Sequence, residues 1–302
     1  MRIFAAILLV IFGGGLALGA CGPHGGDTPL MAAARNGKTE AAILLVQAGA
    51  DVNKAGSYEE PILHLLLKAV SDDLNAVRVL IDAGANVNKE DISGKTPLHV
   101  AVMRKVRSKE TVELLIAAGA SVNIVNQDGE CPLFMAMKTR NRELVQTLIK
   151  AGSALNRKAC RYGKTILHWA IFLHNPEIAE DLIEAGADVN AEEILRRTPL
   201  FFAVMEGYTG VIALLIRNGA EVDLTDYHGN TPLHYAVQEG RRDIAETLIR
   251  NGADVNKVNK DGRTPLELAE WIGSTEIADF LRPLTSLCLS RFNRVIQQCP
   301  LM

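Results

Sequence analysis

The chain has 302 residues, of which 48% are apolar, and its formal net charge is -3 at pH 7. This length and apolar content suffice for one large core or two ordinary ones. The slightly acidic balance excludes a protein that binds nucleic acid through a basic surface spread over the whole chain.

The first 20 residues differ from the rest of the chain. Arg2 gives a short positive start, Ile3 to Phe12 is an apolar run, and Gly13 to Ala20 is small and apolar. This order is typical of a secretory signal peptide, and the segment is too short and too rich in glycine for a comfortable membrane span.

The segment ends in Leu18-Gly19-Ala20-Cys21, which resembles the lipobox of bacterial lipoproteins, where the cysteine becomes the lipid-modified first residue. We therefore predict a lipid anchor at Cys21, secretion across the inner membrane, and a periplasm-facing chain held at a cell membrane. Cleavage after Ala20 without lipidation and an uncleaved anchor are the alternatives. Residues 21–26 form a short linker, which reaches only about 20 Å when fully extended and would keep the next domain close to that membrane.

From residue 27 onward one phrase recurs: Thr-Pro-Leu-His or a near copy, followed later by Gly-Ala-Asp-Val-Asn or a near copy. The steps between successive phrases are 33 to 35 residues. A fixed period of this length predicts stacked units of two helices each. The first position of the phrase falls at Thr28, Pro61, Thr96, Cys131, Thr165, Thr198, Thr231 and Thr264.

Each unit carries signals for two helices and a turn. A threonine at the first position can cap the first helix, and proline is tolerated directly after it. Second helices are predicted at Ala41–Gln47, Thr111–Ala117 and Ile244–Arg250, each followed by a glycine suited to a left-handed helix end. A second glycine usually follows at the tip of the connecting turn, as at Gly229.

These residues closely resemble the ankyrin repeat, with Thr231-Pro232-Leu233-His234 and Gly252-Ala253-Asp254-Val255-Asn256 nearly matching its consensus. The resemblance implies an all-α solenoid over residues 27–283, made of about eight repeats that each add a β-hairpin loop. It also implies a curved stack whose concave face consists of hairpin tips and first helices. Residues 284–302 read as an amphipathic helical tail that caps the last repeat.

Departures from the repeat pattern lie at identifiable places. Repeats 2 and 3 carry two extra residues between their helices, around Ser71-Asp72-Asp73 and Arg107-Ser108-Lys109. The hairpin tip that enters repeat 6 has Arg196 where glycine is usual. Because positive φ is costly for arginine, we expect this tip to be stiffer or differently shaped.

Positive charge is concentrated between Arg104 and Lys164, which span 12 Lys and Arg residues against 5 Asp and Glu residues. Two successive inter-helix loops are predicted to join seven of these charges into one basic patch, either a solvated edge or a contact for an acidic partner or anionic lipid headgroups. Arg157, Lys158, Arg161 and Lys164 are assigned to the hairpin edge instead. The patch comprises Arg104, Lys105, Arg107, Lys109, Lys138, Arg140 and Arg142.

Four histidines share one slot of the repeat, and the resemblance implies that they make structural hydrogen bonds: His64, His99, His168 and His234. Rings in neighbouring repeats lie too far apart to share a metal by themselves. No motif of a metal site, phosphate loop or hydrolase is present. The remaining cysteines, Cys131, Cys160, Cys288 and Cys299, show no metal-binding spacing, and their pairing is left open. We therefore predict no catalytic residue, no metal and no cofactor.

Partner-binding residues are predicted from slots that vary in the family and face the groove, because clustered exposed apolar and aromatic side chains mark contact sites. The alternative is that some of them are buried. Trp169, Phe202 and Tyr235 are assigned to the core. The candidates are Tyr162, Phe172, Leu173, Ile194, Leu195, Met205, Glu206, Tyr227, His228, Gln238 and Glu239, with Trp271 and Ile272 near the end of the array.

The sequence therefore favours a non-catalytic protein-binding module anchored in the envelope of a Gram-negative bacterium. Its layout resembles that of ankyrin-repeat lipoproteins that act as immunity proteins against lipase effectors of type VI secretion. The resemblance makes such a lipase toxin the candidate partner. The alternative is a structural or stress-related envelope adaptor that organises another protein complex.

Overall fold

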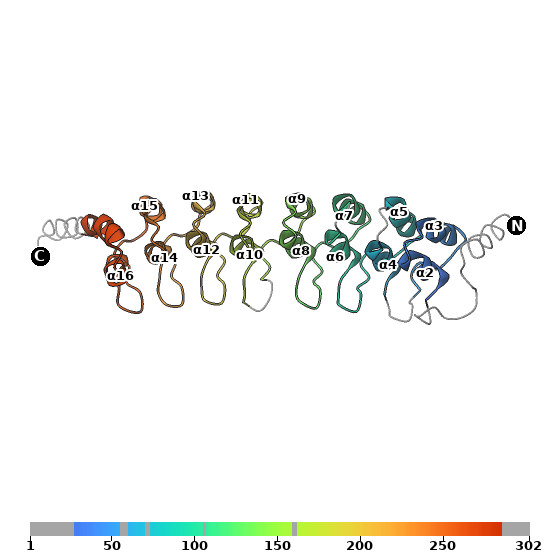
Figure 1. Cartoon of the computed structure of the whole chain (residues 1–302), viewed down its shortest axis with the longest axis horizontal. Helices are drawn as coiled ribbons and strands as arrows, with labels where there is room; N and C mark the ends of the chain where they lie inside the picture. The colour runs from blue at the N-terminus through green and yellow to red at the C-terminus, as the bar shows by residue number, and fades with distance from the viewer. Residues whose placement is uncertain (1–26, 55–59, 70–72, 105–106, 159–161, 286–302) are drawn as a thin grey trace, which may run out of the picture. The chain divides into compact units, whose positions relative to one another are not determined.

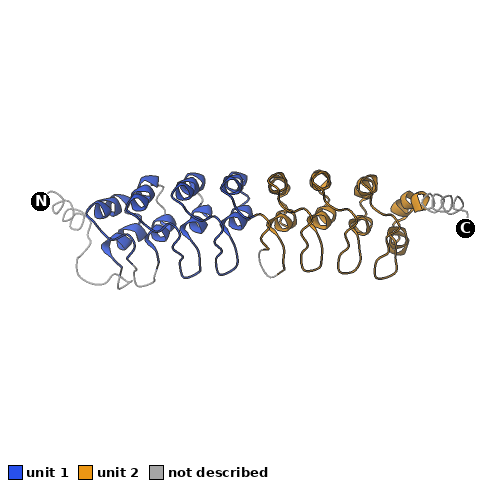
Figure 2. Cartoon of the chain, turned by 180° about the vertical axis from the view of Figure 1, so that it is seen from behind, with its two compact units in different colours: residues 1–154 blue, residues 155–302 orange. Residues whose placement is uncertain are grey.

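The computed structural model describes residues 27–54, 60–69, 73–104, 107–158 and 162–285. They form helices joined by loops, and no strand is assigned within these ranges. The chain divides into two compact units, residues 1–154 (unit 1) and residues 155–302 (unit 2), and each is described by itself (Figure 2).

The described residues of unit 1 contain four helix pairs that follow one another along the chain (Figure 1). First helices pack against first helices, as α2 does on α4 and α4 on α6, and second helices pack in the same way. The helices are α2 (Pro29–Arg35), α3 (Thr39–Gln47), α4 (Ile62–Lys68), α5 (Leu74–Asp82), α6 (Pro97–Val102), α7 (Ser108–Ala117), α8 (Pro132–Lys138) and α9 (Arg142–Lys150).

Unit 2 repeats this arrangement and ends in a pair formed by α16 and a helix over residues 275–285. A buried cluster that includes Leu268, Ile277 and Leu281 holds this last pair together. The predicted capping tail lies outside the described residues apart from positions 284 and 285, which continue the last helix. The other helices are α10 (Ile166–Phe172), α11 (Pro176–Glu184), α12 (Pro199–Glu206), α13 (Thr209–Arg217), α14 (Pro232–Gln238), α15 (Arg242–Arg250) and α16 (Pro265–Ile272).

The recurring phrase forms the start of each first helix, as predicted. The Thr231 backbone is extended, its hydroxyl accepts from the His234 amide, and Pro232 follows as the first helical residue. A proline there removes only an amide that has no partner within the helix. The small alanine of the phrase is buried in seven of the eight first helices, for example Ala101 and Ala203, which lets neighbouring first helices pack closely; α4 has Leu66 in this slot.

Asparagines that close Gly-Ala-Asp-Val-Asn segments or their near copies link one repeat to the next, for example Asn88 and Asn190. In unit 1, Asn88 donates to the Gly119 carbonyl at 3.1 Å and accepts from the Ser121 amide at 2.7 Å. In unit 2, Asn190 makes the same two contacts with Gly219 and Glu221. These side chains satisfy backbone groups that would otherwise be left at helix ends.

Two local expectations are corrected. Second helices begin two or three residues earlier than predicted, at Thr39, Ser108 and Arg242. As a result Lys109 and Arg142 lie in the first turns of α7 and α9, and Lys138 ends α8, so these three are not loop residues. The longer connections are confirmed, because residues 69–73 and 103–107 join helices where residues 139–141 suffice in the fourth repeat.

The expectation of a differently shaped tip at Arg196 is wrong. Arg196 has φ 61°, close to the 77° of Gly229 in the next hairpin. The hydrogen bonds also match: Glu193 N donates to Arg197 O at 3.1 Å, as Asp226 N does to Asn230 O at 2.9 Å. Arginine therefore adopts the left-handed conformation that glycine favours, at a cost of about 1–2 kcal/mol.

Replacing Arg196 by glycine is expected to raise the free energy of unfolding by about 0.5–1 kcal/mol, since relief of the left-handed strain exceeds the added entropy of the unfolded chain. The ion pair lost with Glu192 is exposed and contributes little. Urea denaturation measures the change. The opposite substitution, Gly229→Ala, is the control: its added methyl group would lie 3.0 Å from the Lys260 amide nitrogen and should destabilise the chain. A lower stability for Arg196→Gly would contradict the strain argument.

Candidate functional site

The four slot histidines are buried and bind backbone groups. His99 Nδ1 accepts from the Thr96 amide at 3.0 Å, and its Nε2 lies 3.1 Å from the Glu130 carbonyl in the following hairpin. His168 and His234 make the same two kinds of contact. Each ring therefore ties the start of one first helix to the next hairpin, as the sequence predicted, and burial lowers the pKa of all four histidines.

In repeats 2 and 6, where one member of the threonine–histidine pair is replaced, a polar atom has no hydrogen-bond partner. His64 Nε2 still contacts the Lys95 carbonyl at 2.6 Å, but its Nδ1 has no hydrogen-bond partner because Pro61 stands in the threonine slot. In unit 2 the Thr198 hydroxyl is buried without a partner because Phe201 stands in the histidine slot. The first helices of these two repeats therefore lack the threonine–histidine hydrogen bond at their start.

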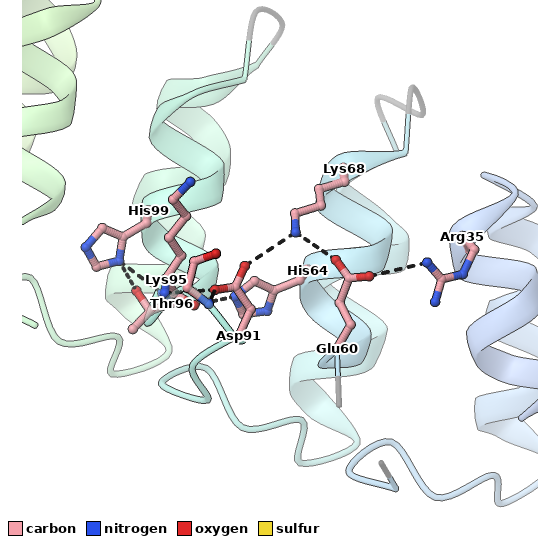
Figure 3. A network of polar contacts seen from close by, with 9 residues as sticks. Arg35, Glu60, His64, Lys68, Asp91, Lys95, Thr96 and His99 are labelled. Atoms are coloured by element: carbon pink, nitrogen blue, oxygen red, sulfur yellow. Dashed lines mark hydrogen bonds and ion pairs between the residues drawn. The ribbon is translucent and has the colours of Figure 1, made fainter. Parts of the chain in front are cut away.

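A chain of ion pairs runs across the first three repeats of unit 1 (Figure 3). Arg35 lies 3.3 Å from Glu60, Lys68 Nζ lies 2.7 Å from the other Glu60 oxygen, and Lys68 also lies 3.4 Å from Asp91. The Asp91 carboxylate accepts as well from the amides of Ser93 and Lys95. This network connects neighbouring hairpins and first helices through paired charges.

The pKa directions follow from that pairing. Burial disfavours the charge of Lys68, but the hydrogen bonds and negative charges of Glu60 and Asp91 outweigh it and raise the pKa of Lys68. Burial alone would raise the pKa of Asp91, but the amides of Lys95 and Ser93 and the nearby positive charges lower it. Both side chains are therefore held in their charged forms.

The predicted basic patch is partly used within unit 1. Arg104 donates to the Leu67 carbonyl at 3.0 Å, Lys109 lies 3.5 Å from Glu143, and Lys138 lies 2.8 Å from Glu130. Lys105 lies outside the described residues. Arg107, Arg140 and Arg142 are exposed.

The predicted partner residues occupy two groups of positions in unit 2. The first group is on hairpin tips: Tyr162 and Tyr227 are each 58% exposed, Ile194 is 66% exposed, and Leu195 and His228 are also exposed. Backbone hydrogen bonds join consecutive tips, from Ile194 N to Tyr162 O and from Tyr227 N to Leu195 O.

The second group is at the ends of first helices. Phe172 is 43% exposed and Gln238 and Glu239 are exposed, whereas Leu173, Met205 and Glu206 are half-buried. Trp271 and Ile272 at the end of α16 are also exposed, and the Arg263 guanidinium lies 4.2 Å from the Trp271 ring. None of the candidates in this group is fully buried.

Sequence reasoning missed a cationic centre in unit 2. Lys164, assigned to the hairpin edge, is only 8% exposed, and its Nζ lies 4.0 Å from the Phe172 ring and 4.8 Å from the Trp169 and Phe202 rings. The Arg197 guanidinium lies 5.0 Å from the Phe202 ring. The sequence signal for this centre was a lysine directly before Thr165, with aromatic residues four and seven positions after that threonine.

The three aromatic residues assigned to the core divide accordingly. Phe202 is buried, at 3% exposure, as predicted. Trp169 and Tyr235 are only half-buried, and the Lys164 ammonium lies over the Trp169 ring. The Tyr235 hydroxyl donates to Asp226 at 2.9 Å, and burial together with that carboxylate raises the pKa of Tyr235 to about 12.

Other classes of site are not found in the described part of the chain. It contains no group of three His, Cys, Asp or Glu residues able to hold a metal ion, and no helix long and apolar enough to cross a bilayer. Cys131 is a free cysteine there. The predicted lipidation site Cys21, and Cys160, Cys288 and Cys299, lie outside the described residues.

Comparison with known proteins identifies the repeats. A family model described as "Ankyrin repeats (3 copies)" matches residues 6–91, 59–126, 98–193 and 192–259, and one described as "Ankyrin repeats (many copies)" matches residues 243–282. Together these matches cover residues 6–282.

Curated relatives match over short segments. The chain is 32% identical over 74 residues to the E3 ubiquitin-protein ligase KEG of Arabidopsis thaliana and 38% identical over 71 residues to mouse Inversin. It is 34% identical over 73 residues to the Neurogenic locus Notch protein of Drosophila melanogaster. Each match covers 24% of this chain but only 5%, 7% and 3% of the respective relative, so the chain spans a small fraction of these proteins.

Proposed function

Because the chain belongs to the ankyrin-repeat family, we propose that it binds a partner protein through the exposed apolar and aromatic side chains of unit 2. Ankyrin repeats form protein–protein interaction modules. The observation that carries the proposal is the exposure of Tyr162, Ile194 and Tyr227 on consecutive hairpins, beside Phe172 at the end of a first helix. Large aromatic side chains of this kind anchor protein interfaces.

We further propose that the chain is a lipid-anchored protein of the Gram-negative envelope and acts there as an immunity protein against a secreted lipase toxin. The Leu18-Gly19-Ala20-Cys21 sequence supports the anchor. The short segment to residue 27 would hold the array at the membrane, where a lipase finds its substrate. One lipid chain binds only weakly, so more than one acyl group is required for stable anchoring.

Affinity purification of the tagged full chain from solubilised envelopes of its source organism tests the binding surface. Phe172→Ala with Tyr227→Ala is expected to reduce partner recovery at least about 10-fold, since loss of interface aromatic residues costs more than about 1 kcal/mol each. The matched control is Met103→Ala with Ile92→Ala, which removes exposed apolar side chains from the same two repeat slots in unit 1. Recovery should persist in this control.

Four outcomes separate the parts of the proposal. Release only by charge reversal of Arg104, Arg107 and Arg140 would place the contact on the basic patch and refute the unit 2 assignment. A recovered housekeeping complex would favour the envelope adaptor over the immunity protein. Deletion of the gene that leaves cells as resistant as before to the lipase toxin would also refute the immunity role, and a Cys21→Ser chain that stays in the membrane fraction would refute the anchor.

A further inference from the structure

Lys164 is a charged side chain more than nine-tenths buried with no carboxylate bound to it. Its Nζ is surrounded by the Trp169, Phe172 and Phe202 rings at 4.8, 4.0 and 4.8 Å from their centroids. No hydrogen bond or ion pair joins this nitrogen to another residue in the described ranges. Aromatic faces attract an ammonium ion, but they do not replace the three acceptors that its N–H groups can bind.

The carboxylate that acts electrostatically on Lys164 belongs to Glu193, and it is already occupied. One Glu193 oxygen accepts from Arg197 Nε at 2.9 Å, from the Leu195 amide at 3.0 Å and from the Arg197 amide at 3.4 Å. The Glu193 side chain is 1% exposed, so it is fixed in this position. The Glu193 carboxylate therefore binds Arg197 and the backbone of its own hairpin. The summed charge of Lys164, Arg197 and Glu193 is positive.

Two lysines of unit 1, in contrast, have their ammonium groups paired with carboxylates. Lys68 binds Glu60 at 2.7 Å and Lys138 binds Glu130 at 2.8 Å, both within the chain (Figure 3 shows the first pair). The Lys68 and Lys138 side chains are each about half exposed, whereas Lys164 is buried. The electrostatic difference agrees with the geometry, since burial and then the Arg197 charge lower the pKa of Lys164.

We propose that Lys164 and Arg197 receive a carboxylate from the partner protein, an Asp or Glu side chain flanked by apolar residues. This inference rests on the proposed function, because it names the chemistry recognised by the same face of unit 2. Lys164 and Arg197 both lie against the Phe202 ring. Phe172, which also contacts the Lys164 ammonium, is exposed to solvent. The neighbouring apolar tips favour apolar residues beside the acid. Lys164 is already buried before the partner binds. An incoming carboxylate therefore gains a paired charge without a further desolvation penalty for the lysine.

A phage-displayed library of random 12-residue peptides, selected on the immobilised full chain, tests the inference. Peptides that bind in a Tyr227-dependent manner are expected to carry Asp or Glu next to apolar residues. Lys164→Met should weaken binding of such a peptide at least about 30-fold, which is the scale for loss of one member of a buried charge pair. The same loss is expected when the peptide's acid is changed to its amide. Lys257→Met, which removes an exposed lysine of unit 2, should leave affinity unchanged.

Thermal unfolding distinguishes recognition from a structural role. Lys164→Met should melt at the same temperature as the parent chain or higher, because it removes a buried cation without a counter-charge and keeps similar volume. A melting temperature several degrees lower, together with loss of binding, would assign Lys164 to folding and overturn the inference. Tyr227-dependent peptides with no acid preference would overturn it and leave the proposed function standing. If no selected peptide depends on Tyr227, both proposals are overturned.

Discussion

Lowering the pH from 7 to 4 is expected to destabilise the folded chain by roughly 3 kcal/mol through His168 alone. Burial, which exceeds the opposing effect of the Arg197 carbonyl, lowers the pKa of His168 from 6.5 to about 4. In the unfolded chain this histidine binds a proton near pH 6.5, whereas in the folded chain it stays neutral until about pH 4. Between these values the unfolded state binds more protons, so stability falls as the pH falls.

The stabilisation is complete above pH 6.5 and is lost by about pH 4. His64, His99 and His234 add to the loss in the same direction, because burial lowers their pKa values too. Ordinary carboxylates begin to titrate only near pH 4–5, so the interval from pH 6.5 to 5 isolates the histidines.

Urea titrations followed by tryptophan fluorescence measure this effect where it should be largest. The chain's two tryptophans, Trp169 and Trp271, both belong to unit 2, which also contains His168. His168→Gln is the control: it is less stable at pH 7 but lacks the titrating ring, so its stability should change less between pH 6.5 and 5. Equal stability of the parent chain at pH 7 and pH 5 would contradict a buried neutral His168.

The repeat architecture followed directly from the sequence because its signals act locally. A threonine before Pro-Leu-His starts a helix by a hydrogen bond within four residues. A glycine after the second helix ends that helix in a left-handed turn. Such signals need no knowledge of distant contacts. The starts of second helices were misplaced because those positions lack a strong cap; Arg107, for example, precedes α7 with φ 46° and no side-chain cap.

The candidate site was predicted less completely, because burial and charge pairing depend on residues one repeat away. Tyr162, Ile194 and Tyr227 were identified as exposed hairpin residues from their slots alone. Lys164 was assigned to the hairpin edge, since nothing in its neighbourhood in sequence shows that the Phe202 ring, in the next repeat, lies 4.8 Å from its Nζ. The aromatic surroundings of Lys164 arise only when neighbouring repeats stack on one another.

The two units use the same slots for different chemistry. Seven residues after the threonine position, unit 1 has Lys68 and Lys138, which bind carboxylates of their own repeats or the next hairpin. Unit 2 has no lysine in that slot but Phe172, Met205, Gln238 and Trp271, whereas the other two members in unit 1 are Arg35 and Met103. The lysines of unit 1 are already paired and have little to gain from a charged partner. Lys164 of unit 2 lies among aromatic rings without a carboxylate, so this surface offers a partner both apolar area and charge. This difference is the reason to look for the partner on unit 2.

Replacing His99 by alanine is expected to cost about 3–4 kcal/mol, from a cavity and from buried polar groups that lose their partners. His99 serves the Thr96 amide and hydroxyl and the Glu130 carbonyl, so all three are left unsatisfied. His64→Ala is the matched control within unit 1 (Figure 3). Both rings are fully buried, but His64 binds only the Lys95 carbonyl.

The control should therefore cost about 1–2 kcal/mol less, which is the value of the missing cap. Urea denaturation followed by circular dichroism measures both variants, and hydrogen exchange at the Thr96 amide should accelerate only in His99→Ala. A third variant tests the cause: Pro61→Thr supplies the absent hydroxyl and amide, so a subsequent His64→Ala should become as costly as His99→Ala. Equal costs for the two histidines in the parent chain would mean that cavity formation dominates and that the threonine–histidine bond contributes little to the stability of each repeat.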